Sequence, residues 1–143
     1  GSQYTVLEFD QPTRSAAEAA GAIGCTLAQI AKSLVFAGPD DEPVLIVASG
    51  VNRVDEEKVG ALLGGEIRQV DAAYVKENTG FSIGGVAPLG HTKRLTVLLD
   101  GDLQDFTQIW AAAGTANAVF KLTPVQLQSL TGGNYCEVKS AGI

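Results

Sequence analysis

The sequence is poor in the residues that bind metals: its 143 residues include one histidine and two cysteines. A structural zinc site takes about four such ligands, so a zinc framework of cysteine and histidine is excluded. The two cysteines, Cys25 and Cys136, stand far apart in the chain. A disulfide between them is one alternative, but nothing in the sequence indicates export. We therefore expect two reduced, packed cysteines in a cytoplasmic protein.

The sequence also lacks long apolar runs and an excess of basic residues. No apolar run approaches the roughly 20 residues of a membrane-spanning helix, and the alanine-rich residues 15–24 are too short and too polar for a signal peptide. The formal net charge of −6 excludes a broadly basic nucleic-acid binder, and we expect no DNA partner. Residues 79–143 are balanced, with four acidic and four basic residues, so an anionic ligand would meet least repulsion there.

What the sequence does contain is a globular composition, with 45% hydrophobic and 18% charged residues. A chain of this length buries roughly two thirds of its unfolded surface. One domain over residues 3–143 is therefore expected, without internal repeats or a linker. Gly1 and Ser2 resemble the remnant of a purification tag.

Local signals divide the rest into helices and strands. Helix caps are expected at Thr13, Asp55 and Thr123. The apolar segments 32–38 and 43–50 flank a turn and predict an antiparallel hairpin. Several strands follow one another without a helix between them, which favours an α+β (mixed α/β) single domain over a regular doubly wound fold. The predicted helices span residues 13–24, 26–31, 55–65, 71–80 and 123–133, and the predicted strands span 32–38, 43–50, 66–70, 94–100, 106–114, 117–122 and 134–138.

The densest glycine cluster is the stretch "TGFSIGGVAPLGH", residues 79–91. It fits neither standard nucleotide-binding loop, because Val86 stands where a phosphate loop needs lysine and no G-x-G-x-x-G is present. Glycine lets a backbone come close to a ligand, so that N–H groups can point at an anion or a polarised carbonyl. A tight structural turn is the alternative interpretation.

Five segments carry a family resemblance: "AKSLVF" (31–36), "PVLIVASG" (43–50), "NTGFSIGGVAPLGH" (78–91), "VLLD" (97–100) and "AAAGTANAVFKLTPVQL" (111–127). In this order they resemble the YbaK / prolyl-tRNA synthetase-associated editing family, whose members are free-standing relatives of the editing domain inserted in bacterial prolyl-tRNA synthetases. The resemblance runs from about Thr13 to Val138, nearly the whole chain.

The resemblance implies a curved, largely antiparallel sheet with flanking helices. It also implies hydrolysis, in trans and without a metal or other cofactor, of the ester between a wrong amino acid and its tRNA. The partner would be the acceptor end of an aminoacyl-tRNA, with prolyl-tRNA synthetase as a further partner and no membrane. The family's functional lysine corresponds to Lys32, and Gly84 and Gly85 would offer N–H groups to the ester carbonyl. The expected substrate-binding residues are Thr79, Gly80, Phe81, Pro88, Gly90, Asp100 and Gly114.

The residues themselves leave alternatives open for these roles. Lys32 could stabilise charge at the ester or contact the tRNA end, or it could be a strand-end lysine that reaches water. Asp100 could orient the glycine loop or bind the α-ammonium group of the substrate, or it could end a strand in a turn. His91 titrates near neutrality, but it has no recognisable nucleophile partner in the sequence, and we expect a structural role.

A synthetase cannot reject a slightly smaller amino acid by binding alone, because one methyl group is worth only about 1–3 kcal/mol. An editing site solves this problem if its walls exclude the correct amino acid by size. Family members that remove cysteine from proline tRNA carry a basic residue in a late turn, and "AAAGTANAV" (111–119) has none. Alanine, serine and threonine are therefore further candidate substrates. Two rival functions are a non-catalytic module that binds tRNA or a synthetase, and a hydrolase of small amino-acid esters. The candidate sieve walls are Val35, Phe81, Ile83, Val86 and Leu89.

Overall fold

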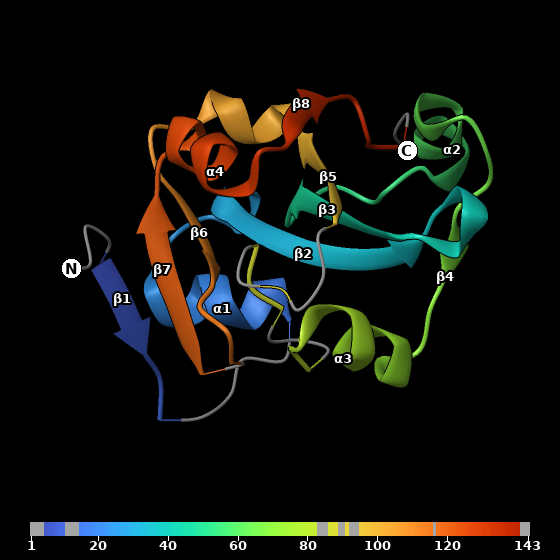
Figure 1. Cartoon of the computed structure of the whole chain (residues 1–143). Coiled ribbons are helices and arrows are strands. Elements are labelled where there is room, and N and C mark those ends of the chain that lie inside the picture. Colours follow the sequence, from blue (N-terminus) through green and yellow to red (C-terminus); the bar gives the residue numbers. More distant parts are fainter. Residues whose placement is uncertain are drawn as a thin grey trace.

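The computed structural model describes residues 5–10, 15–82, 86–88, 91, 95–115 and 117–140. Within these residues the chain forms one mixed sheet of eight strands with four α-helices packed around it (Figure 1). The strands are β1 (Thr5–Glu8), β2 (Ile30–Ala37), β3 (Pro43–Ser49), β4 (Arg68–Gln69), β5 (Thr96–Asp100), β6 (Ile109–Ala112), β7 (Ala118–Leu122) and β8 (Asn134–Cys136). The helices are α1 (Ala16–Ile23), α2 (Glu56–Leu63), α3 (Ala72–Thr79) and α4 (Pro124–Thr131).

The sheet has the strand order β1-β7-β6-β2-β3-β5-β8, and β4 pairs with β2 outside this path. Among the described strands, β1–β7, β2–β3, β2–β4 and β6–β7 are antiparallel, whereas β2–β6, β3–β5 and β5–β8 are parallel. The expected α+β class is confirmed, with antiparallel pairs in a narrow majority. The first and last described strands, β1 and β8, form the two opposite edges of the sheet.

The two faces of the sheet carry separate cores, because neighbouring residues of a strand point to opposite faces. On one face, Leu45 and Val47 pack with Val75 of α3 and Leu127 of α4. On the other face, Val44 and Ile46 pack with Val59 of α2, and a smaller cluster joins Ile30 to Ala19 and Ala20 of α1. The central strands β2 and β3 are therefore covered on both sides.

Most local predictions agree with the structure. The predicted hairpin is the β2–β3 pair, with Ala31 opposite Ser49 and Ala37 opposite Pro43. Asp55 caps α2 by accepting a hydrogen bond from the Lys58 N–H (3.0 Å). Thr123 caps α4 and forms a capping box with Gln126. Gly24, Gly64 and Gly80 end three helices as their sequence positions indicate.

Three local predictions need correction. α1 is capped by Ser15, whose Oγ accepts from the Glu18 N–H, and the predicted cap Thr13 lies outside the described residues. The helix predicted over 26–31 is a single 3₁₀ turn, Leu27–Gln29, because Ile30 and Ala31 pair with β6 instead. The strand predicted from residue 106 starts at Ile109, after a 3₁₀ segment at Gly101–Asp105. No strand is predicted at the position of β1, Thr5–Glu8.

Candidate active site

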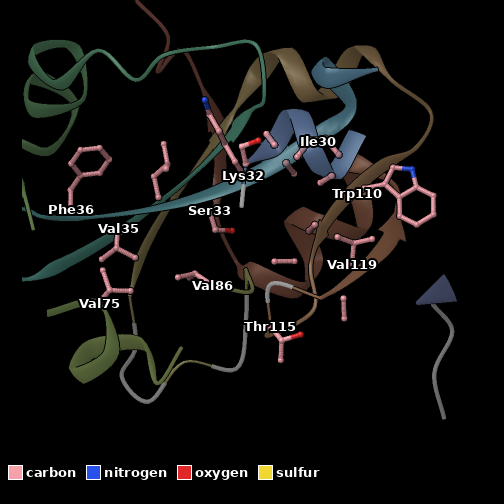
Figure 2. A pocket seen from close by; sticks show the side chains of 18 of the residues that line it. Ile30, Lys32, Ser33, Val35, Phe36, Val75, Val86, Trp110, Thr115 and Val119 are labelled. Carbon is pink, nitrogen blue, oxygen red and sulfur yellow. The ribbon is translucent and has the colours of Figure 1, made fainter. Parts of the chain in front are cut away.

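A gap in the pairing of the sheet opens into a cavity beside strand β2. β3 pairs with β2 continuously from Ala31 to Ala37. Among the described residues, the other edge of β2 is paired only at its ends, by β6 at Ile30 and Ala31 and by β4 at Phe36 and Ala37. A cavity of about 470 Å³ lies beside the intervening residues 32–35 (Figure 2).

The side chains that line the cavity are mostly apolar, and many of them are small. α1 contributes Ala16 and Ala19, and Ser15 lies at the start of that helix. Lys32 is the sole charged side chain among the described lining residues, and Ser33, Gln69 and Thr115 are other polar ones. The remaining lining residues are Ile30, Ala31, Leu34, Val35, Phe36, Val70, Val75, Val86, Trp110, Ala111, Ala112, Ala118 and Val119. Such a cavity suits a small, uncharged side chain.

Lys32 is the third residue of β2, opposite Ala48 of β3. Its side chain points to the opposite side of β2 from those of Ser33 and Val35 (Figure 2). Burial lowers the pKa of the Lys32 amine; Asp100 acts in the opposite direction, and Arg53 lowers the pKa further. Because burial disfavours the charged form, the Lys32 ammonium group gains little stability from its position.

Asp100 ends β5 and is 1% exposed. Its Oδ2 accepts hydrogen bonds from the Ser49 N–H (3.0 Å) and from Asn52 Nδ2 (2.7 Å), and its Oδ1 accepts from the Asp102 N–H (3.0 Å). Asn52 also donates to Asp102, which forms an ion pair with Lys139. These contacts join the ends of β3 and β5 and leave Asp100 little capacity for a substrate ammonium group. They support its structural alternative.

The described part of the glycine-rich stretch is held by local contacts. Thr79 Oγ1 donates to the Val75 carbonyl (2.7 Å) and accepts from the Phe81 N–H (3.0 Å). His91 packs edge-on against Phe81, with ring centroids 5.7 Å apart, and its Nε2 lies 2.7 Å from the Ala87 carbonyl oxygen. A carbonyl only accepts, so Nε2 carries the proton.

Phe81 also connects this stretch to the turn between β6 and β7. Gly114 in that turn has φ +104°, and a Cβ atom there would lie 3.3 Å from Cε1 of Phe81. The positive φ favours glycine at this position, and a Cβ atom would also require the Phe81 ring to shift by a few tenths of an ångström. The predicted site residues Phe81 and Gly114 thus meet, although neither lines the described cavity.

The structure separates the predicted site residues into three groups. Lys32 lines the cavity, together with the predicted sieve residues Val35 and Val86. Thr79, Gly80, Phe81, Pro88, Asp100 and Gly114 are described but are not among the residues that line it. Gly84, Gly85 and Gly90, with the sieve candidates Ile83 and Leu89, lie outside the described residues. The roles assigned to all of these residues stay predictions.

Sequence reasoning missed several residues of the cavity. Ser33 follows Lys32, and its Oγ is buried without a hydrogen-bond partner among the described residues. The signal in the sequence that could have identified Ser33 is its position as a polar residue inside an apolar strand. Trp110 and Thr115 come from segments where the sequence shows only a strand and a turn. The contribution of α1 could not be read from the sequence, because it depends on tertiary packing.

Comparison with known proteins shows the family of this chain. The family model of the aminoacyl-tRNA editing domain matches residues 10–130. The chain belongs to the aminoacyl-tRNA editing domain family. A crystal structure described as that of a proposed trans-editing enzyme for prolyl tRNA synthetase is 44% identical, with a TM-score of 0.91 and coverage of 96% of this chain and 87% of that chain.

Two further relatives agree with this assignment. EbsC of Enterococcus faecalis, a proposed Cys-tRNA(Pro)/Cys-tRNA(Cys) deacylase, is 29% identical over 140 residues, covering 94% of this chain and 84% of the relative. The proline–tRNA ligase of Lactobacillus helveticus is 30% identical over 94 residues, which is 65% of this chain and 16% of that enzyme. This chain therefore matches most of EbsC but only a small part of the proline–tRNA ligase.

The environment of His91 gives a first prediction. Burial lowers the pKa of His91, and its hydrogen bond to Ala87 offsets part of that effect. Because the folded-state pKa is depressed, its contribution to stability is present above the unfolded pKa of about 6.5 and is lost as pH falls below it. We expect His91→Ala to lose about 1–2 kcal/mol of stability through the lost hydrogen bond and ring contact.

We also expect His91→Ala to keep most of the deacylation activity proposed below, within about threefold (about 0.7 kcal/mol) at pH 7.5. Rate measurements at a temperature well below the melting point separate the two effects. A rate that follows the ionisation of His91 and collapses in His91→Ala would instead make the imidazole a general base.

Proposed function

We propose that this chain hydrolyses, in trans, the ester bond between proline tRNA and a small wrong amino acid. The observation that carries the proposal is the cavity of about 470 Å³, which is lined mainly by apolar side chains, many of them alanine and valine, and also by Lys32 of β2. The family membership supports the reaction, and the relatives named above support proline tRNA as the carrier. Prolyl-tRNA synthetase is the proposed source of the substrate.

The proposed reaction needs no covalent intermediate. Water adds to the acyl carbon, the bond to the terminal ribose oxygen breaks, and the products are the free amino acid and the uncharged tRNA. The protonated Lys32 amine would stabilise negative charge that develops at the ester or contact the tRNA end. Gly84 and Gly85 remain predicted donors to the acyl oxygen. Within this proposal, catalysis comes mainly from positioning and from fixed charge and dipoles.

Two features of the cavity favour a neutral, small side chain. Among the described lining residues, no acidic group is present and Lys32 is the sole cation. The turn before β7 contributes Thr115 to the cavity instead of a basic residue. Alanine and serine are therefore the preferred candidates, with threonine and cysteine next.

The rim of the cavity also suits a nucleotide. Trp110 lines the cavity, and Nζ of Lys121 lies 6.0 Å from the centroid of its ring. An aromatic ring with a nearby cation is a common arrangement for binding a base and its phosphate. This arrangement supports the end of a tRNA as the ligand despite the net charge of −6.

The test is single-turnover deacylation of proline tRNA that carries alanine, serine, threonine, cysteine or proline. We expect release of at least one small wrong amino acid and little release of proline. Amino-acid methyl esters serve as the comparison substrates, and equal rates on these esters would support a small-ester hydrolase. Tight binding of the charged tRNAs without release of any amino acid would support a non-catalytic module and refute the proposed activity.

A further inference from the structure

The cavity exposes main-chain polar groups of β2 as well as side chains. At one end of the β2–β3 hairpin, the Gly38 N–H donates to the Glu42 carbonyl (2.7 Å). At the other end, the Gly50 N–H donates to the Ile30 carbonyl (2.8 Å). In an antiparallel pair, residues that bond the partner alternate with residues whose N–H and C=O groups point to the other edge. Since residues 30 and 38 bond toward β3, the odd-numbered residues between them point away from it.

Two of these odd-numbered residues, Ser33 and Val35, fall within the gap. Ala31 meets β6 and Ala37 meets β4, but no described strand pairs with Ser33 or Val35. The buried Ser33 Oγ also lacks a hydrogen-bond partner among the described residues. A buried polar group without a partner costs about 1–3 kcal/mol, so a ligand that pairs with it gains affinity. Ser33 therefore places an N–H, a C=O and a hydroxyl at one point of the cavity.

We propose that the main chain of Ser33 binds the aminoacyl group of the substrate in the way that a strand residue binds the residue opposite it in an antiparallel sheet. This inference rests on the proposed function. A hydrogen-bonded antiparallel residue pair exchanges two bonds, and an α-aminoacyl ester has the matching groups. Its α-ammonium group donates to the Ser33 C=O, and its acyl oxygen accepts from the Ser33 N–H. That N–H then faces the oxygen on which negative charge develops during hydrolysis.

The size of the gap favours this occupant over a peptide. Residues 32–35 separate the β6 and β4 pairings, which is too short for a typical added strand. Side chains of a directly paired couple lie on the same face, about 5 Å apart. The substrate side chain would therefore lie next to Ser33 Oγ, on the face that carries Val35, Val75 and Val86. These three valines leave room for a small side chain.

The first test follows the main-chain amides by NMR. The probe is adenosine that carries alanine on its 3′ position through an amide bond, which the protein cannot hydrolyse as an ester. On saturation we expect the Ser33 amide resonance to shift and its hydrogen exchange to slow at least tenfold. The amides of Lys32 and Leu34, which already point to β3, should change less. An unchanged Ser33 amide at saturation, or an equal change with adenosine alone, overturns the assignment.

The second test uses variants of the same residue. Ser33→Ala removes only the hydroxyl, and we expect the probe to bind roughly three- to tenfold more weakly. Ser33→Pro also removes the N–H without removing a bond to β3, a change that an open edge tolerates, and we expect at least about tenfold weaker binding. Ser129→Ala, an exposed serine on α4, is the matched control and should bind as the wild type does.

Wild-type affinity in both Ser33 variants overturns the proposal. If Ser33→Pro does not fold, Ser33→Ala and the wild-type amide spectrum decide the question. The wild-type deacylation assay is read separately. Release of amino acid with an unaffected Ser33 amide refutes this inference alone, whereas probe binding at Ser33 without any release refutes the proposed activity alone.

Discussion

Replacing Lys32 with methionine should reduce single-turnover deacylation at least about tenfold, which corresponds to about 1.4 kcal/mol of transition-state stabilisation. Methionine keeps most of the apolar stem but removes the charge, so the loss would report on the ammonium group. The same variant should melt at the wild-type temperature or slightly above it. Burial lowers the pKa of this lysine, so the folded state disfavours its charged form and loses nothing when the charge is removed.

A matched control is Lys58→Met on α2, because Lys58 binds the Lys139 carbonyl and lies outside the described cavity lining. It should deacylate at the wild-type rate. Lys32→Arg adds a second comparison, since it keeps the charge but changes its shape and donor geometry. A Lys32→Met variant as active as the wild type would remove Lys32 from the mechanism.

The largest loss of stability is expected from Asp100→Ala. Its carboxylate accepts hydrogen bonds from the Ser49 and Asp102 main chain and from Asn52, all within 3.0 Å. Truncation leaves the buried Ser49 N–H without an acceptor and separates the ends of β3 and β5. We expect a loss of about 3 kcal/mol in the free energy of unfolding, measured by urea titration.

Asp102→Ala is the comparison for this prediction. It removes the carboxylate that pairs with the partly exposed Lys139 but keeps the main-chain N–H that binds Asp100. The expected loss is at most about 1 kcal/mol. Equal stability losses in the two variants would show that Asp100 is no more important to the fold than its partly exposed neighbour Asp102.

The features that the sequence predicts correctly are those set by short-range chemistry. Asp55 and Thr123 cap helices by bonding a main-chain N–H three residues away, so their roles are readable from the sequence. The β2–β3 hairpin follows from two apolar runs around a turn. The β1 strand was missed because it is short, mostly exposed and paired with β7 far along the chain.

In the candidate site, too, local features could be predicted from the sequence and long-range features could not. Lys32 could be proposed from its family motif, and the structure places it at the cavity. The open edge beside Ser33 depends on where β6 and β4 stop pairing with β2, and no local pattern determines those end points. The sheet's parallel pairs are also long-range. A polar side chain in an apolar strand is a hint from sequence, but its lack of a partner is a property of the folded chain.

The position of the terminal strands has a consequence for the order of folding during synthesis. The β2–β3 hairpin can form as soon as residue 49 has left the ribosome, whereas Thr5 of β1 must wait for Lys121 of β7. β6, which closes one end of the gap beside β2, also arrives late. The nascent chain therefore carries a half-covered sheet until β7 emerges, and during that interval its free edges are open to pairing with other chains.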